Sequence, residues 1–348
     1  MFEKISEMGH EQVIFCQDPS VGYRSIIALH STVLGPAAGG TRCWPYATDA
    51  EALDDVLRLS RGMTYKSAVA GLNFGGGKAV IITNGRINDR EALFRAHGRF
   101  IERLGGRFIT AEDVGTNATD MGYINLETNF VAGTTDRGGD PAPWTSLGVF
   151  RGIQASAIYK WGTDDLSGKT VALQGCGNVG YQLAARLHQA GASLIVTDLD
   201  AQRASRVADE FNAVAVAPEA IYDVEADIFA PCALGGILND QTLPRLKAKI
   251  VAGAANNQLL ADHHGEALSK RGILYAPDYV INAGGVISGS IALAGGDETQ
   301  TRQTVERIYD TLLKLFEMAA ADHLPTSLMA DRLAEQRLQA GRKTAHTP

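Results

Sequence analysis

Three charged side chains on glycine-rich segments are the strongest candidates for chemistry in this sequence. Lys66 and Lys78 lie twelve residues apart, and Lys78 directly follows the glycines at 75–77. Asp113 follows a short apolar run, in the segment AEDVGT. Two ammonium groups can bind a substrate carboxylate, and a carboxylate beside them can transfer a proton. From residue types alone, solvated lysines and a turn aspartate are an equally good interpretation.

The glycines before Lys78 differ from a phosphate-binding loop at two defining positions. Such a loop has a glycine five residues before its last glycine, where this chain has Leu72. It also has Ser or Thr after the lysine, where this chain has Ala79. A glycine run before a lysine and an apolar segment indicates instead a backbone that passes close to a ligand.

A dinucleotide-binding motif is the second candidate. Gly175, Gly177 and Gly180 fit the pattern GxGxxG between the apolar run TVALQ and a helix-like segment. In such a motif the glycines allow a tight turn, close approach of a pyrophosphate and close helix packing. Asp198 ends the next apolar run, where it would accept hydrogen bonds from ribose hydroxyls and repel a 2'-phosphate, which predicts NAD. The alternative is a turn whose glycines serve packing only.

Strand-like and helix-like segments alternate on both sides of a Gly/Pro/Asp-rich stretch that begins at Asp136. This alternation predicts an α/β fold, and we place a domain boundary in that stretch. The expected strands lie at 13–17 and 24–30 (a hairpin), 79–83, 107–110, 170–175, 193–198, 227–233, 249–255 and 272–282, and the expected helices at 49–63, 89–104, 145–161 and 179–191.

The bulk composition is that of an ordinary globular protein. Of 348 residues, 45% are hydrophobic and 20% are charged, with a net charge of -7. The acidic balance argues against a nucleic-acid partner, and no apolar run is typical of a membrane span. The charged N-terminus lacks the apolar core of a signal peptide, so we expect a cytoplasmic protein.

The cysteines and histidines show no metal-binding pattern, so we predict no metal site. Cys16, Cys43, Cys176 and Cys232 lie far apart without a CxxC pair, as expected of reduced thiols in the cytoplasm. The pair His263-His264 has no carboxylate or thiol pattern around it, so we expect both histidines on the surface.

Seven segments resemble the bacterial leucine, phenylalanine and valine dehydrogenases of the glutamate dehydrogenase superfamily. They are LGPAAGGTR, GMTYKSAVAGLNFGGGKAVII, RFITAEDVGT, ALQGCGNVG, DIFAPCALGG, VAGAANNQL and GILYAPDYVINAGG. The resemblance implies a substrate-binding and oligomerisation domain on a mixed β-sheet (1–142), followed by a Rossmann-like NAD-binding domain (143–323). The active site would lie in the cleft between them, and C-terminal helices (324–348) would pack back on the first domain.

The resemblance also implies roles for individual residues. Lys66 would bind the substrate carboxylate, Lys78 would be the catalytic lysine, and Asp113 would exchange a proton with the amino group. The remaining substrate-binding assignments are Gly39, Gly40, Asn257 and Asn282, together with the pocket residues Ala38, Ala111, Val286 and Gly289. The cofactor-binding assignments are Thr145, Gly175, Gly177, Asn178, Val179, Gly180, Asp198, Cys232, Ala233, Ala254 and Asn256.

The reaction implied is the reversible, NAD-dependent oxidative deamination of an apolar L-amino acid to its 2-oxo acid and ammonia. Hydride leaves the substrate Cα, Lys78 activates water to attack the resulting imine, and Asp113 shuttles protons until ammonia departs. The resemblance further implies a homo-oligomer, either a dimer or an octamer.

The side-chain pocket departs from the leucine pattern at two positions. Ala38 replaces a leucine and Gly289 replaces a valine, whereas Ala111 and Val286 keep the leucine-type residues. A larger pocket would admit phenylalanine, unless a neighbour such as Phe74 refills the space. Leucine, valine or isoleucine and an aromatic-specific activity (phenylalanine or tryptophan) therefore remain open.

Other functions fit the sequence less well. Glutamate is disfavoured because no side chain for a second carboxylate is evident. An inactive NAD-binding protein would not need all three charged residues, and a 2-hydroxy-acid dehydrogenase would need a histidine–carboxylate pair near the glycine-rich turns.

Overall fold

The computed structural model describes residues 2–133 and 139–345 and divides the chain into two compact units. The first unit comprises Met1–Asp140, Gly289–Gly296 and Leu333–Pro348. The second comprises Pro141–Ser288 and Asp297–Arg332. The expected boundary stretch from Asp136 falls partly on residues 134–138, which lie outside the described residues.

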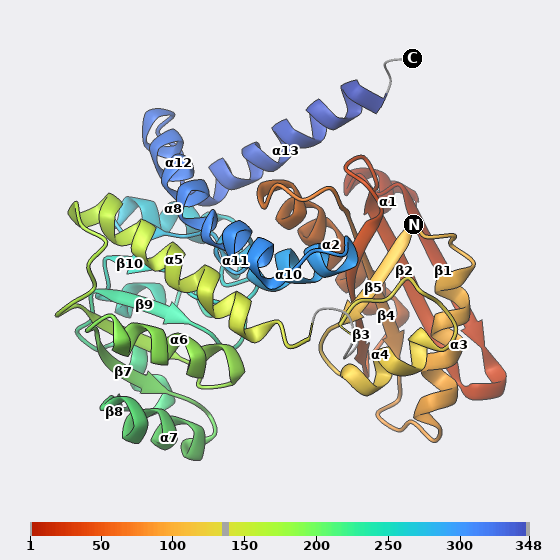
Figure 1. Ribbon diagram of the computed structural model, residues 1–348, viewed down its shortest axis with the longest axis horizontal. Helices are drawn as coiled ribbons and strands as arrows, with labels where there is room; N and C mark the ends of the chain where they lie inside the picture. Colours follow the sequence, from red (N-terminus) through yellow and green to blue (C-terminus); the bar gives the residue numbers. More distant parts are fainter. Residues whose placement is uncertain (1, 134–138, 346–348) are drawn as a thin grey trace. The chain divides into compact units, whose positions relative to one another are not determined.

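The first unit is built on a five-stranded mixed sheet in the order β1-β2-β4-β3-β5 (Figure 1). β1 (Gln12–Asp18) and β2 (Tyr23–Ser31) form the predicted hairpin, and β2 also pairs antiparallel with β4 (Gly75–Ile82). β3 (Ala37–Trp44) runs parallel to its neighbours β4 and β5 (Phe108–Glu112). The predicted mixed sheet is therefore confirmed.

Helices cover both faces of this sheet because side chains alternate along each strand. α2 (Asp49–Val69), capped by Thr48, packs its Leu57 in a core that includes Val80 of β4. The opposite core contains Ala79 of the same strand and Phe94 of α3 (Arg90–Glu102). The expected helix 49–63 is thus longer, and Lys66 lies in its last turn. The other helices of this unit are α1 (Phe2–Glu7) and α4 (Ala118–Asn125).

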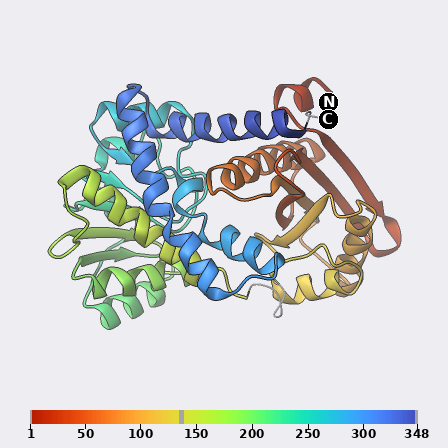
Figure 2. The ribbon, with the colours of Figure 1, turned by 45° about the horizontal axis from the view of Figure 1, so that its top comes forward.

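The C-terminal part of α13 (Thr326–Ala345) packs on the end of α2 within the first unit (Figure 2). The Arg337 guanidinium donates hydrogen bonds to the backbone carbonyls of Ser67, Ala68 and Leu72, at 3.2, 2.8 and 2.9 Å. The Ser67 and Ala68 carbonyls lie at the C-terminus of α2, where the helix dipole favours a cation, and Leu72 lies in the loop that follows. The chain end therefore anchors the turn of α2 that carries Lys66.

The second unit contains a parallel six-stranded sheet in the order β11-β10-β9-β6-β7-β8. Its strands are β6 (Thr170–Gln174), β7 (Ser193–Thr197), β8 (Val214–Ala215), β9 (Ile228–Pro231), β10 (Ile250–Val251) and β11 (Leu274–Tyr275). Val171, Ala172 and Leu173 are all buried, so β6 is covered on both faces as the apolar runs predicted. The order reverses between β9 and β6, and ligands bind at the carboxyl ends of strands at such a switch point.

Helices complete the second unit, and the Rossmann-like prediction for it is confirmed. They are α5 (Ala142–Trp161), α6 (Asn178–Gln189), α7 (Ala201–Phe211), α8 (His263–Lys270), α9 (Asp278–Ile281), α11 (Glu298–Glu306) and α12 (Ile308–Ala321). α10 (Gly284–Leu293) has residues in both units. Among the described helices, none is long and apolar enough to cross a membrane.

Candidate functional site

The predicted catalytic pair meets on the face of the first sheet that α2 covers. The Lys78 Nζ atom lies 2.9 Å from Asp113 Oδ1. Lys78 is in β4 and Asp113 directly follows β5, so β3 runs between them. The register places Gly40 of β3 beside Ala111 of β5. A Cβ atom at Gly40 would overlap the Glu112 carbonyl oxygen and lie 2.9 Å from Asp113 Cβ, so the glycine allows the charged pair to form.

Charge keeps Asp113 ionised despite its burial. Burial alone would raise the pKa of Asp113. The charges of Lys78 and Arg42, and the hydrogen bonds from both, outweigh burial and hold the pKa of this carboxyl below its ordinary value. The Asp113 backbone N–H donates to the Thr116 hydroxyl at 2.9 Å, which fixes the turn after β5. The arrangement can therefore supply a fixed carboxylate base beside a fixed ammonium group.

Arg42 also belongs to this cluster of charges, although no sequence pattern indicated it. Its Nε–H donates to Asp113 Oδ2 at 2.8 Å, and its Nη1–H donates to Asp55 Oδ2 at 2.8 Å. The signal that could have found it is the spacing of two residues from Gly40, which puts both on one face of a strand. This spacing is informative only if 37–44 is recognised as a strand, and the paired glycines in that segment do not indicate a strand.

The other residues of the first unit that the sequence predicts for the substrate site lie on α2, β3, β5 and α10. Lys66 is half-buried on α2, the helix that packs on β4, and Ala38 and Ala111 are partly buried in β3 and β5. A Cβ atom at Gly39 would overlap the Gly77 carbonyl oxygen, so only glycine fits there. A Cβ atom at Gly289 would meet nothing within 4 Å.

In the second unit, the three motif glycines have different structural roles. Gly175 has a φ of 100°, which favours glycine, and it makes the turn after β6. A Cβ atom at Gly180 would overlap the Gly175 carbonyl oxygen, so Gly180 permits close packing of α6 on the turn. Gly177 precedes Asn178 and Val179 in the first turn of α6, and a Cβ atom there would meet nothing within 4 Å. Space is therefore open where a pyrophosphate would approach.

Asp198 is bound to the glycine-rich turn itself. One oxygen, Oδ2, accepts a hydrogen bond from the Cys176 backbone N–H at 2.7 Å. The other, Oδ1, accepts from the Asp200 backbone N–H at 2.8 Å. The carboxylate thus connects the end of β7 to the turn after β6, and it fixes the place where a ribose would bind. Cys232 and Ala233 follow β9 at the same sheet edge.

A buried amide group lies beside the segment that follows β10 at the carboxyl edge of the sheet. Asn282 is 5% exposed, and its Nδ2 atom donates to the Ala254 carbonyl at 2.9 Å and to Asn256 Oδ1 at 2.8 Å. Its Oδ1 atom is buried and has no hydrogen-bond partner among the described residues. An unpaired buried acceptor is costly, and a ligand donor would satisfy it. Nearby Asn257 has a positive φ of 51°.

Thr145 lies in the first turn of α5, within the second unit. Its hydroxyl donates to the Pro141 carbonyl at 3.0 Å. A Cβ atom at Gly285 would lie 2.9 Å from this hydroxyl, so the start of α10 passes close to it. Val286 follows on α10.

The histidine pair differs from the expectation of two surface residues. His263 is exposed, but His264 is buried, with 2% of its surface exposed, so that prediction is wrong for His264. His264 packs against the loop before α8, where its Nδ1 atom contacts the Ala261 backbone. Its Nε2 atom lies 3.3 Å from Asp240 Oδ1, and that of His263 lies 3.7 Å from the same oxygen.

These three side chains are close enough to hold a metal ion, yet hydrogen bonding accounts for their arrangement. The His264 Nδ1 atom accepts from the Ala261 backbone N–H at 3.0 Å in one tautomer and donates to the Ala261 carbonyl at 3.1 Å in the other, and Nε2 faces Asp240. The absence of a metal site therefore remains a prediction.

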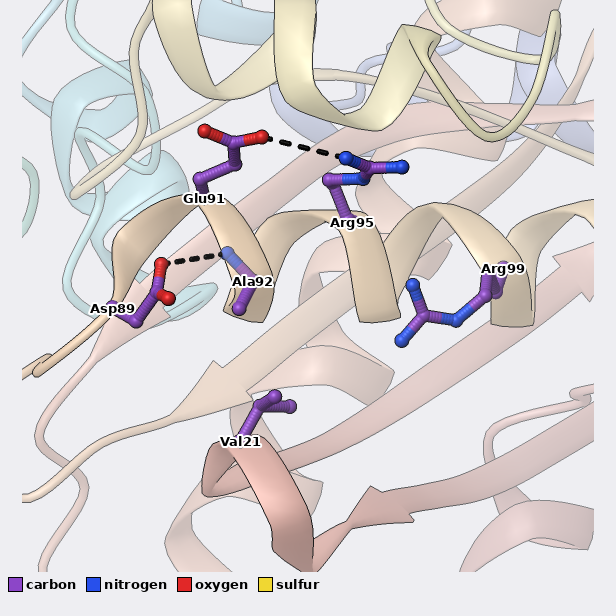
Figure 3. Close-up of a pocket in the computed structure, with 6 residues that line it drawn as sticks. All are labelled: Val21, Asp89, Glu91, Ala92, Arg95 and Arg99. Atoms are coloured by element: carbon purple, nitrogen blue, oxygen red, sulfur yellow. Dashed lines mark hydrogen bonds and ion pairs between the residues drawn. The ribbon is translucent and has the colours of Figure 1, made fainter.

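The outer surface of α3 carries a separate hollow of about 280 Å³ (Figure 3). Its lining residues are Val21, Asp89, Glu91, Ala92, Arg95 and Arg99. Asp89 caps α3, and Arg95 and Arg99 are paired with Glu127. None of the predicted site residues lines this hollow.

Two substitutions separate the packing role of the turn from its role in binding. We expect Gly180→Ala to destabilise the protein by about 1–3 kcal/mol through overpacking, because its Cβ atom would overlap the Gly175 carbonyl. Gly177→Ala should change stability by less than about 0.5 kcal/mol, since its Cβ atom would be free. Both should weaken NADH binding. Thermal unfolding and NADH fluorescence titration check this, and normal NADH affinity in Gly177→Ala would contradict the assignment.

Comparisons with known proteins show the family to which the chain belongs. Residues 10–130 match the family described as "Glu/Leu/Phe/Val dehydrogenase, dimerisation domain", and residues 196–325 match "Glutamate/Leucine/Phenylalanine/Valine dehydrogenase". The chain is 53% identical to leucine dehydrogenase of Geobacillus stearothermophilus, over 99% of this chain and 94% of that protein. It is 47% identical to phenylalanine dehydrogenase of Bacillus thermotolerans, over 99% of this chain and 92% of that protein.

A solved structure is similar along its whole length. The crystal structure of L-tryptophan dehydrogenase from Nostoc punctiforme superposes with a TM-score of 0.87 at 49% identity, covering 99% of this chain and 100% of that one. The resemblance noted in the sequence is confirmed. The chain belongs to the glutamate/leucine/phenylalanine/valine dehydrogenase family, a family of amino-acid dehydrogenases that generally use a nicotinamide cofactor.

Proposed function

We propose that this amino-acid dehydrogenase uses NAD to deaminate an apolar L-amino acid to its 2-oxo acid and ammonia, and catalyses the reverse amination. The observation that carries the proposal is the 2.9 Å contact between Lys78 and Asp113 across a glycine-lined strand. It joins a proton donor to a proton acceptor on a face where Gly39 and Gly40 leave room for backbone approach. Proton transfer to and from an amino group needs such a pair.

Within the first unit, the proposal divides the charges by role. Lys66 binds the substrate carboxylate, since it is the lysine on α2 and half-buried. Asp113, held ionised by its neighbours, accepts a proton from the substrate ammonium group. Lys78 then assists a water molecule in attacking the imine, and Asp113 returns the proton to the departing ammonia.

The second unit fits a dinucleotide. Gly177 leaves open space at the N-terminus of α6, whose free N–H groups and dipole favour a pyrophosphate. Asp198 at the end of β7 suits the ribose hydroxyls, and the unpaired Oδ1 of Asn282 suits the carboxamide N–H of nicotinamide. When bound, NAD supplies the acceptor for the hydride that leaves the substrate Cα. Thr145, Asn256 and Asn257 complete the proposed contacts.

The substrate pocket supports overlapping activity on aliphatic and aromatic amino acids. Ala38 and Ala111 are small, and space is open around Gly289. An aromatic-specific activity is the second candidate, favoured by this open space and by the similarity to a tryptophan dehydrogenase along the whole chain.

The proposal also covers assembly and location. The match of residues 10–130 to a family region described as a dimerisation domain supports a homo-oligomer, a dimer or an octamer. The cysteine spacing and acidic composition support a cytoplasmic enzyme, with no nucleic-acid or membrane partner.

The direct test is NADH formation with a panel of L-amino acids at alkaline pH. We expect activity with leucine, methionine and phenylalanine and none with glutamate. Because Asp198 would repel a 2'-phosphate, kcat/KM with NAD should exceed that with NADP by at least about tenfold, the effect of 1.4 kcal/mol. Absence of activity across the panel would refute the proposed function, and equal use of both cofactors would refute the role of Asp198.

The two lysines should differ in their kinetic effects. Lys66→Ala should mainly raise KM, since a carboxylate contact exists in the ground state and the transition state alike. Lys78→Ala should mainly lower kcat, by about 10²–10⁴. Steady-state kinetics with one amino acid measures both. A normal kcat in Lys78→Ala, with activity lost in Lys66→Ala, would show that the roles are reversed.

Refilling the pocket tests the substrate assignment. The double variant Ala38→Leu/Gly289→Val should raise the ratio of kcat/KM for leucine over phenylalanine, since each added methylene fills space worth about 0.8 kcal/mol. Apolar pockets discriminate by roughly 10–200-fold per methylene. Each single variant serves as a control for additivity. A shift toward phenylalanine, or none, would mean that these positions do not contact the side chain.

A further inference from the structure

Asp113 is held from two sides, and only one of them belongs to the proposed catalytic pair. Its Oδ1 atom faces Lys78, and its Oδ2 atom accepts a hydrogen bond from Arg42 Nε at 2.8 Å. The Arg42 side chain is 20% exposed and the Lys78 side chain 6% exposed. The carboxylate therefore has one oxygen directed to the proposed proton-transfer partner and one occupied by a guanidinium group.

The Arg42 side chain is itself held in place by the carboxylate of Asp55. Asp55 of α2 accepts from Arg42 Nη1 at 2.8 Å and from the Tyr46 hydroxyl at 2.6 Å through the same oxygen, Oδ2. Its Oδ1 atom accepts from Arg58 at 2.9 Å. The Asp55 side chain is 13% exposed. Because Arg42 and Tyr46 share one oxygen of this partly buried carboxylate, the Arg42 guanidinium has little freedom.

We propose that Arg42 is a positioning residue for the reaction: it fixes the Asp113 carboxylate with Oδ1 toward Lys78, and Asp55 fixes Arg42. The inference rests on the proposed function, because it gives Asp113 the role of proton acceptor. A guanidinium group bridges two carboxylates through opposite edges, and a lysine ammonium at the same place would reach one of them as a point charge. The bridge links β3, α2 and the turn after β5, which are the elements that surround the proposed reaction centre.

The charge of Arg42 also sets the direction of a pH effect. Asp113 can accept a proton only when ionised, and Arg42 helps to hold its pKa below the ordinary value. Removing the charge of Arg42 raises the pKa of Asp113. As the pH falls, the ionised and active form of Asp113 is then lost at a higher pH than in the parent. Besides Arg42, the charged group that acts on Asp113 is Lys78 on β4, and Asp55 on α2 is the other charged partner of Arg42. The Arg42 variants leave Lys78 and Asp55 unchanged.

The experiment compares pH profiles of kcat/KM for deamination in the parent, Arg42→Met and Arg42→Lys. We expect the acid limb of Arg42→Met to move upward by about one pH unit, since an arginine beside an aspartate lowers its pKa by 1–3 units. At the parent optimum its kcat should fall at least about tenfold, with a smaller change in KM. Arg42→Lys should move the acid limb part of the way back to that of the parent, because lysine restores the positive charge. It should restore kcat to a smaller extent, because lysine cannot bridge the two carboxylates.

Two variants at the anchor complete the test. Asp55→Asn weakens the support of Arg42 and should lower kcat while leaving Asp113, Lys78 and Arg42 in place. Arg58→Met is the matched control, since Arg58 contacts the other oxygen of the same Asp55 and its side chain is 56% exposed. It should keep the parent profile. Thermal unfolding and circular dichroism establish that each variant is folded.

The outcomes separate the two claims. If the parent itself deaminates no amino acid, the proposed function is refuted and this inference with it. If the parent is active but the acid limb and kcat of a folded Arg42→Met coincide with those of Arg58→Met, the inference alone is overturned. If Arg42→Met does not fold, the same comparison applies to Arg42→Lys and Asp55→Asn, and parent-like kinetics in both overturns it.

Discussion

The ion pair between Lys78 and Asp113 depends on a strand that has no side chain at the crossing point. β3 lies between the strands of these two residues, and any Cβ atom at Gly40 would push Asp113 away. Glycine is disfavoured in strands because it packs poorly and loses more entropy on folding. The pairing of β3 with β4 and β5 on both sides offsets this cost. The geometry of the proposed catalytic pair therefore requires glycine in a strand, where glycine costs stability.

The second unit also has glycines at positions where a side chain would overlap the neighbouring backbone. Gly175 and Gly180 are needed for the turn to close on α6, whereas Gly177 faces open space. Asp198 then ties this turn to the end of β7 through two backbone N–H groups. Backbone donors held by a carboxylate keep the turn in one conformation. A ligand that binds there finds the site already formed, and it does not have to order the loop.

Dense apolar runs made most of the fold predictable, whereas its least apolar strand was missed. The runs around Val80 and Val171 predicted strands that the structure confirms. The segment AAGGTRCW did not, because two glycines and a charge break its alternation, and only its neighbours make it a strand. The contact between Arg42 and Asp55 could not be predicted either, because Arg42 was not placed on a strand. The helix end at 63 was wrong because Thr64 and Tyr65 are buried against the sheet, a tertiary contact that local pattern does not show.

The two faces of β3 divide charge from neutral hydrogen bonding. Arg42 points to the α2 face, with the charges of Lys78 and Asp113. Thr41, on the opposite face, contacts His97 at 2.8 Å and Thr110 at 2.6 Å, and His97 also contacts the Tyr23 hydroxyl at 2.7 Å. Burial lowers the pKa of His97 to about 3, so this network stays uncharged at neutral pH. A buried, uncharged network of hydrogen bonds is rigid, and it adds no charge that would act on Lys78 or Asp113. The charges on the α2 face thus act on a strand whose other side is fixed, and Lys78 and Arg42 set the orientation of the Asp113 carboxylate.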